Sequence, residues 1–253
     1  MRHNTAYTLI FATIICVGCG VLVSSAAVSL KDRQKFNAEL DKKKKVLEAA
    51  GLTGEDEKVT PERVDELFGN IETLGVELKT GDLVADLAAD YDQLKAAADP
   101  ATSFEAPSNR SAIKRLPNVA QVFKVLKDDG SLDMYVLPIE GLGLWGTLYG
   151  FLALDADLNT VRGITYYTHK ETPGLGGEVD NPRWKASWPG RKVFGENGDV
   201  QLAVIKGQAG SPEAAPYAVD GLSGATITSN GVTFMIDFWL GENGFGPFLE
   251  SVS

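Results

Sequence analysis

The sequence predicts an α+β fold with a largely antiparallel sheet and flanking helices. The first observation is a series of short apolar and aromatic runs between residues 119 and 168, which short turns separate. The second is that apolar residues recur at helical spacing both before and after this region. Because short turns join consecutive strands as hairpins while helices gather at both ends, the sheet is expected to be antiparallel.

The N-terminal segment carries no charged residue from Asn4 to Leu30. A helix that crosses a bilayer needs about 20 apolar residues, whereas the apolar core of a signal peptide needs about 7–15. The length of the segment therefore predicts an N-terminal transmembrane anchor over residues 1–30. A signal peptide cleaved at Ser25-Ala26-Ala27 is the alternative.

Charge does not settle the orientation of this anchor. Arg2 precedes it, while Lys31, Arg33 and the four lysines at 42–45 follow it. Positive residues mark the cytoplasmic side, which would keep the rest of the chain in the cytoplasm. The rule is weak for long translocated domains, and a long domain follows here.

The composition argues against nucleic acid as a partner, because the formal net charge is −10 at pH 7 and no basic patch is interleaved with aromatic residues. The two cysteines, Cys16 and Cys19, both lie inside the apolar segment. Two thiolates are half of a metal site, so any metal there would need ligands from another subunit. We predict two small apolar residues of a helix instead, and no metal site in this chain.

Residues 31–118 are predicted to form a helical stalk or insert. Thr60-Pro61-Glu62 is typical of a helix start, with a hydroxyl cap, a proline in the first turn and an acid near the positive end of the dipole. Apolar residues then recur at Val64, Leu67, Phe68 and Ile71, and again at Leu83, Leu87, Tyr91 and Leu94. The prolines and polar residues at 101–118 predict a loop.

Residues 119–253 are predicted to form the main domain. Strands are expected at 119–126, 134–137, 145–154, 161–168 and 202–205, and a helix at 230–240. Asp128-Asp129-Gly130 is expected to turn the chain between the first two strands. Residues 155–159 resemble part of a cation loop, but the remaining ligand spacing is missing, so a turn is the better interpretation.

A motif near the C-terminus combines glycines with four hydroxyl groups. It reads Asp220-Gly221-Leu222-Ser223-Gly224-Ala225-Thr226-Ile227-Thr228-Ser229. Gly221 and Gly224 permit tight turns and close approach to a ligand. The motif lies just before the predicted helix, where free N–H groups suit a phosphate. Taken alone, it is better explained as a helix cap.

The motif resembles D-x-x-[S/T]-G-A-T, which a flavin transferase recognises in bacterial membrane redox complexes. A glycine-rich stretch at Gly141–Gly150 and an H-x-E-T-P-G-L-G stretch that begins at His169 extend the likeness. Together these segments resemble the FMN-binding domain of two related proteins. One is the subunit designated C in the Na+-translocating NADH:quinone reductase, and the other is the subunit designated G in the Rnf electron-transport complex. The ending at 237–249, the length, the single anchor and the long insert resemble the reductase subunit, and the Rnf type is the alternative.

The resemblance implies FMN attached covalently to Thr226 by a phosphoester bond. It implies an electron-transfer subunit that is not catalytic alone, within a complex that couples NADH oxidation by quinone to sodium export. The implied partners are the flavin transferase and other subunits carrying FMN, riboflavin, FAD and an iron–sulfur centre. Because the transferase acts outside the cytoplasm in this family, a single-pass protein of the bacterial inner membrane with a periplasmic C-terminal domain is expected.

The flavin site is expected to draw on three segments. Leu144, Trp145 and Leu175 could flank the isoalloxazine ring by stacking and dispersion. Glycines allow backbone N–H groups to approach the ring, and Thr172 could add one hydrogen bond. The predicted cofactor-binding residues are Leu144, Trp145, Thr172, Gly174, Leu175, Gly176, Ser223, Gly224, Ala225 and Thr226, with Thr228 and Ser229 assisting.

No catalytic residue is predicted. His169 and Glu171 lie two residues apart after a strand, and no serine nucleophile is arranged with them, so they are expected to shape the loop. A rival function of another class is a membrane-anchored assembly module that holds no redox cofactor.

Overall fold

The computed structural model describes residues 4–54, 59–85, 87–88 and 91–253. The chain divides into two units, Met1–Lys42 and Lys43–Ser253. Helix α1 (Thr5–Ala49) supplies nearly all of the described first unit and continues into the second. Arg2, which entered the charge argument, lies outside the described residues.

The first unit is a strongly apolar helix. Its most apolar 18-residue window has a mean hydropathy of 2.3, and none of that window is buried. Within the described ranges, α1 is the one helix long and apolar enough to cross a bilayer, by length and composition. This finding supports the predicted anchor, although the helix runs on past residue 30.

The second unit is built on a six-stranded sheet in the order β2-β1-β5-β6-β7-β8. Its strands are β1 (Ile71–Glu77), β2 (Leu83–Val84), β5 (Val119–Leu126), β6 (Leu132–Leu142), β7 (Thr147–Asp155) and β8 (Val161–Thr168). Every neighbouring pair is antiparallel. The predicted α+β fold with a largely antiparallel sheet is therefore confirmed.

Shorter elements surround the sheet. They are α2 (Pro61–Phe68), α3 (Gln93–Ala98), β3 (Ser103–Glu105), β4 (Arg115–Pro117), the 3-10 helix η1 (Gly176–Asp180), α4 (Pro182–Lys185), β9 (Ala203–Val204), β10 (Ala218–Val219) and α6 (Gly246–Ser251). β3 pairs with β4 antiparallel, whereas β9 and β10 are parallel.

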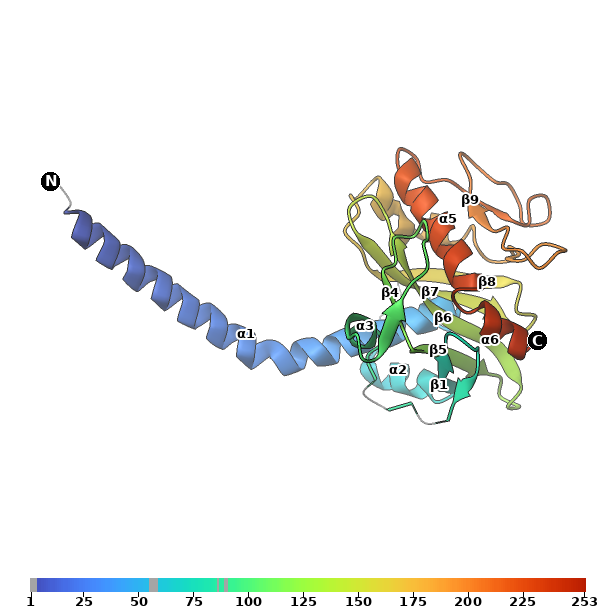
Figure 1. Ribbon diagram of the computed structural model, residues 1–253, viewed down its shortest axis with the longest axis horizontal. Coiled ribbons are helices and arrows are strands. Elements are labelled where there is room, and N and C mark those ends of the chain that lie inside the picture. The colour runs from blue at the N-terminus through green and yellow to red at the C-terminus, as the bar shows by residue number, and fades with distance from the viewer. Residues whose placement is uncertain (1–3, 55–58, 86, 89–90) are drawn as a thin grey trace. The chain divides into compact units, whose positions relative to one another are not determined.

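Helix α5 (Thr226–Leu240) packs against one face of the sheet (Figure 1). The ring N–H of Trp239 donates to the carbonyl of Glu140 on β6 at 2.7 Å. A Cβ on Gly141 would lie 2.8 Å from the Met235 side chain, so the missing side chain lets helix and sheet meet. The main core of the second unit lies on this face and holds, among others, Leu137, Ile139, Leu148, Val232 and Ile236.

The last turns of α1 cover the opposite face of the sheet. On β8, Ile164 and Tyr166 belong to the core on the α5 side of the sheet. Gly163 and Thr165 alternate with them and therefore lie on the opposite face. The Thr165 hydroxyl donates to the carbonyl of Lys45 at 2.9 Å, and Gly163 lies against the backbone of Ala49. Leu47 is fully buried. These turns are thus part of the second unit's fold.

The prediction of a helical segment over 31–118 is partly wrong. Helix α2 begins as predicted, with the Thr60 hydroxyl accepting the Arg63 N–H at 3.4 Å. However, Ile71 opens β1, which pairs with β5 along its whole length. Of the second apolar repeat only Leu94 lies in a helix, and the predicted loop at 101–118 contains the β3–β4 hairpin. Pairing with strands far along the chain overrides the local helical spacing.

The main domain follows the prediction more closely. The strands at 119–126 and 161–168 have the predicted bounds, and those at 134–137 and 145–154 correspond to β6 and β7. The turn at Asp128–Gly130 is confirmed, since the Gly130 N–H donates to the Lys127 carbonyl at 2.9 Å. The helix expected from residue 230 begins at Thr226 instead. This earlier start places Thr226 in the first turn of α5.

Candidate functional site

The C-terminal motif forms the entry into α5. Gly224 has a φ of +70°, a left-handed conformation that a side chain would strain. Ala225 is the N-cap residue and makes no side-chain cap hydrogen bond. Since the first N–H groups of a helix have no partner within it, they stay available to an acceptor beside Thr226. A negatively charged group is favoured at this end of a 15-residue helix.

The four hydroxyl groups of the motif differ sharply in exposure. Thr228 and Ser229 are buried, at 0% and 5% exposure. The Thr228 hydroxyl donates to Glu171, and the Ser229 hydroxyl accepts the Leu222 N–H at 3.1 Å. Ser223 and Thr226 are exposed. Only these last two hydroxyls of the motif are accessible to a modifying enzyme.

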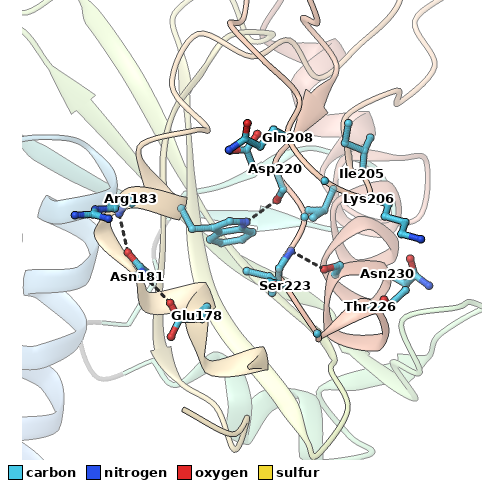
Figure 2. A pocket seen from close by; sticks show the side chains of 17 residues that line it. Glu178, Asn181, Arg183, Ile205, Lys206, Gln208, Asp220, Ser223, Thr226 and Asn230 are labelled. Atoms are coloured by element: carbon cyan, nitrogen blue, oxygen red, sulfur yellow. Dashed lines mark hydrogen bonds between the residues drawn. The ribbon is translucent and has the colours of Figure 1, made fainter. Parts of the chain in front are cut away.

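A pocket of about 630 Å³ opens beside Thr226. Its lining residues come from η1, α4, the loop after β9, the motif and the first turn of α5. Figure 2 shows the labelled ones, which are Glu178, Asn181, Arg183, Ile205, Lys206, Gln208, Asp220, Ser223, Thr226 and Asn230. The pocket is large enough for part of a flavin nucleotide.

Two hydrogen bonds to Asp220 hold the pocket wall in place. One carboxylate oxygen of Asp220 accepts the Ala209 N–H at 2.7 Å, and its carbonyl accepts the ring N–H of Trp184 at 2.7 Å. Asp220 therefore has a structural role in this wall. The lining carries two cationic side chains, Arg183 and Lys206, and two acidic ones, Glu178 and Asp220.

The predicted ring-binding residues are exposed and lie near the motif. Leu144, Trp145 and Leu175 are exposed by 47%, 65% and 44%. The Leu175 side chain lies 3.1 Å from where a Cβ on Gly224 would stand. None of the three lines the pocket, so the structure offers a pocket of mixed polar and apolar lining and a separate apolar surface near Thr226.

The loop at 171–177 is tightly built. Thr172 is exposed, but its carbonyl accepts the N–H groups of Leu175 and Gly177 at 3.1 and 2.9 Å. Gly174 has a φ of +77°, while Gly176 is buried against Glu171 and Thr228. This turn presents Leu175 on the surface.

Glu171 joins the three predicted segments. Its buried carboxylate accepts the Trp145 N–H at 2.8 Å and the Thr228 hydroxyl at 2.5 Å. His169 supports the same loop, because its ring bonds Asp180 at 2.7 Å and accepts the Glu171 N–H at 3.1 Å. These contacts agree with the prediction that both residues shape the loop.

These features fit an FMN group. Exposed apolar side chains suit the flat ring, and the uncapped helix start suits the phosphate. Sequence reasoning missed the far wall of the pocket, including Arg183 and Lys206. Gly221 of the motif contacts this wall. A side chain at Gly221 would collide with the carbonyl of Ile205, and the Gly221 N–H donates to the Gly207 carbonyl at 2.8 Å.

Hydrogen bonds within the protein engage the acidic turn at 155–159. Burial acts to raise the pKa of Asp157, but hydrogen bonds from Thr160, Asn159 and Lys192 hold it well below its usual range. Its carboxylate also pairs with Lys192 at 3.0 Å. No group of three or more potential metal ligands occurs within the described part of the chain.

Comparison with known proteins identifies the family. The FMN-binding domain family matches residues 143–241. The subunit designated C of the Na(+)-translocating NADH-quinone reductase from Vibrio vulnificus (strain YJ016) is 49% identical to this chain, over 92% of the chain and 90% of the relative. The chain belongs to this family, NqrC. The Pseudomonas aeruginosa member is 45% identical over 99% of this chain and 97% of its own length.

The fold of this chain is also similar to that of a solved NqrC structure. The crystal structure of Shewanella oneidensis NqrC superposes with a TM-score of 0.76 at 35% identity, covering 83% of this chain and 95% of that one. The predicted resemblance to this reductase subunit is thereby confirmed. Members of the family are named as subunits of an oxidoreductase complex, and the matched domain is an FMN-binding one.

Proposed function

We propose that this protein is the electron-transfer subunit NqrC of a Na+-translocating NADH:quinone reductase, with FMN joined to Thr226 by a phosphoester bond. The observation that carries the proposal is the exposed hydroxyl of Thr226, in the first turn of α5 and in the wall of the pocket. Membership in the NqrC family and the FMN-binding domain support the cofactor and the reaction class.

Position within the motif favours Thr226 over Ser223. Both are exposed, but Ser223 precedes the left-handed Gly224 and stands outside the helix. A phosphate on Thr226 would lie at the helix start, where unpaired N–H groups and the dipole stabilise a negative charge.

The ring of the attached flavin would rest on Leu144, Trp145 and Leu175, whose exposure leaves their apolar surfaces free to contact it. Gly176 and its neighbours would bring backbone N–H groups near the ring edge. When bound, FMN supplies one-electron transfer, while the protein orients the ring and sets its electrostatic surroundings. No residue of this chain needs to act on NADH or quinone.

The membrane and partner assignments extend the same proposal. Helix α1 would anchor the chain in the bacterial inner membrane, with residues 43–253 in the periplasm, where a flavin transferase would load Thr226. Other subunits of the reductase would deliver and accept the electrons. The apolar helix supports the anchor, and the names of the relatives support a multi-subunit reductase.

Covalent loading tests the proposal directly. The full chain is produced with a flavin transferase, and flavin fluorescence of the denatured band is recorded in a gel. The wild-type band should fluoresce, and Thr226→Leu should be dark because it has no hydroxyl to bear the phosphate. Ser223→Ala, which removes the other exposed hydroxyl, is the matched control and should stay fluorescent.

Mass spectrometry of the tryptic peptide that spans Thr226 locates the attachment. A mass increase of FMN less one water on Thr226 is the expected result. A dark wild-type band in the presence of active transferase would rule out covalent flavin and favour the cofactor-free assembly module. Fluorescence that disappears in Ser223→Ala but persists in Thr226→Leu would move the attachment to Ser223.

A further inference from the structure

The Glu171 carboxylate occupies an unusual place for an acid. It is buried, with 5% exposure, yet both of its oxygens face segments of the proposed flavin site. Oε1 accepts the N–H of Trp145, on the turn between β6 and β7, at 2.8 Å. Oε2 accepts the hydroxyl of Thr228, two residues after Thr226 on α5, at 2.5 Å. One side chain thus ties the ring-binding turn to the attachment helix.

The glycines around Glu171 make room for this carboxylate. A Cβ on Gly143 would stand 2.6 Å from Oε1, and one on Gly176 would collide with Oε2 and approach the Thr228 hydroxyl to 2.6 Å. A side chain at either position would displace the acid or break its hydrogen bonds. The glycines at 143 and 176 therefore serve the acid as well as any ligand.

Two hydrogen-bond donors contact this carboxylate directly. Its two oxygens accept from a backbone N–H and a hydroxyl, and it forms no salt bridge with a described lysine, arginine or histidine. A charge held in a buried site acts on its surroundings more strongly than the same charge in water. An ionised Glu171 would therefore exert a negative field at Trp145, whose N–H it accepts.

We propose that Glu171 is a positioning residue that also lowers the reduction potential of the flavin. It would align the Trp145 turn with the first turn of α5, and its charge would oppose the gain of an electron by the ring. This inference rests on the proposed FMN site. The role assigned to Glu171 goes beyond loop shaping, because it predicts a change in the electronic property of the cofactor.

Two substitutions separate charge from hydrogen bonding. Glu171→Gln keeps the size of the side chain, and its amide can accept from Trp145 while donating to Thr228, so mainly the charge is lost. Thr228→Val keeps the charge and removes one donor to it. Glu140→Gln removes the carboxyl of a half-buried residue on β6. It is the matched control because the hydrogen bond that ties Glu140 to α5 uses its backbone carbonyl, which the substitution keeps.

The experiment uses the full chain, loaded by the transferase and purified in detergent. Midpoint potentials are measured at pH 8 by redox titration of the flavin absorbance, with in-gel fluorescence as the measure of loading. Glu171→Gln should load within about twofold of wild type and show a more positive potential, since an uncharged site favours the reduced ring. Thr228→Val should show a potential equal to or below wild type, and Glu140→Gln should match wild type.

Several outcomes would overturn the inference. An unchanged potential in loaded Glu171→Gln would refute the role of the charge, as would an equal rise in Glu140→Gln. Loading of Glu171→Gln below a tenth of wild type would assign the residue to attachment and not to the potential. Glu171→Ala should lose flavin circular dichroism, and an unchanged signal would refute the positioning role. A dark wild-type band would instead reject the proposed function itself.

Discussion

Four hydroxyl groups near the start of α5 have different chemical fates because the fold exposes only two of them. Thr228 and Ser229 use their hydroxyls inside the protein, in bonds to Glu171 and to the Leu222 N–H. Ser223 and Thr226 face solvent. In the proposed attachment, burial alone would leave Ser223 and Thr226 as the two candidate hydroxyls of the motif.

A second acidic residue shows how burial tunes single side chains. Burial raises the pKa of Glu140 on β6 to about 7. The pKa of Tyr167 on β8 is raised by its own burial and further by the charges of Glu140, Tyr149 and Asp92. Glu140 is therefore neutral in the folded protein over a pH range in which an exposed glutamate would be ionised.

This shift predicts a pH-dependent effect of Glu140→Gln on stability. Below pH 4.5 the acid is protonated in both the folded and unfolded chains, so the variant should match wild type. As pH rises from 4.5 to 7, the unfolded chain ionises first and the wild-type fold loses stability, by up to about 3 kcal/mol. The variant should thus be more stable than wild type at pH 8.

Urea unfolding at pH 4 and pH 8, followed by tryptophan fluorescence, measures this difference in the free energy of unfolding. Asp237→Asn is a suitable control, because that carboxylate is half exposed and pairs with Arg110 on the surface. Equal stabilities of wild type and Glu140→Gln at both pH values would show that Glu140 is solvated in solution.

At the scale of elements, α1 belongs to two environments. Its first part is apolar and unburied, whereas Val46, Leu47 and Ala49 are buried in the second unit. Ion pairs reinforce this end, since Glu48 bonds Lys45 at 2.8 Å and Lys185 of α4 at 2.7 Å. The final turns of the anchor helix therefore contribute to the stability of the domain that carries the flavin site.

Removal of one buried side chain from these turns tests that contribution. Leu47→Ala should lower the free energy of unfolding of the second unit by about 2–5 kcal/mol, because Leu47 is fully buried. Leu22→Ala is the matched control, since Leu22 is 72% exposed in the same helix. Urea unfolding in detergent, followed by tryptophan fluorescence, measures both. Equal small effects would show that the end of α1 does not pack on the sheet.

Sequence prediction succeeded where elements are decided locally. Strands β5 to β8 follow one another through short turns, so each is paired with its neighbour along the chain and its own pattern suffices. Strand β1 was not predicted, because its partner β5 lies farther along the chain, beyond α3 and the β3–β4 hairpin. Its first residue, Ile71, continues the helical spacing of α2, and only the long-range pairing with β5 shows that it begins a strand.

The candidate site was predictable on one side only. Thr226, Trp145 and Leu175 stand in motifs that the family shares, so a resemblance could single them out. Lys206 and Arg183 lie in segments without a motif and reach the pocket through the parallel β9–β10 pair and α4. The buried role of Glu171 also needed coordinates, because its partners lie 26 and 57 residues away.

At the scale of the whole molecule, one apolar helix and one folded unit suit a membrane-bound redox protein. The relatives match this chain over nearly its full length, so the match includes both the apolar helix and the folded unit. The proposed arrangement requires residues 43–253 on the periplasmic side, which the lysines at 42–45 would oppose if charge alone decided orientation.

A fusion of alkaline phosphatase after Ser253 tests the orientation, because that enzyme becomes active only outside the cytoplasm. We expect high phosphatase activity in cells that express the fusion. A β-galactosidase fusion at the same residue is the control and should be inactive. A stable but inactive phosphatase fusion would place the domain in the cytoplasm and contradict loading by a periplasmic transferase.

The exposed apolar residues near Thr226 also bear on how the protein behaves without a bound cofactor. Without a cofactor the protein exposes apolar side chains of the kind that promote self-association, namely Leu144, Trp145, Leu175 and Ile227. The net charge of −10 counters this tendency, since like-charged molecules repel one another. If the flavin ring covers these side chains, attachment of the cofactor also lowers the tendency of the protein to self-associate.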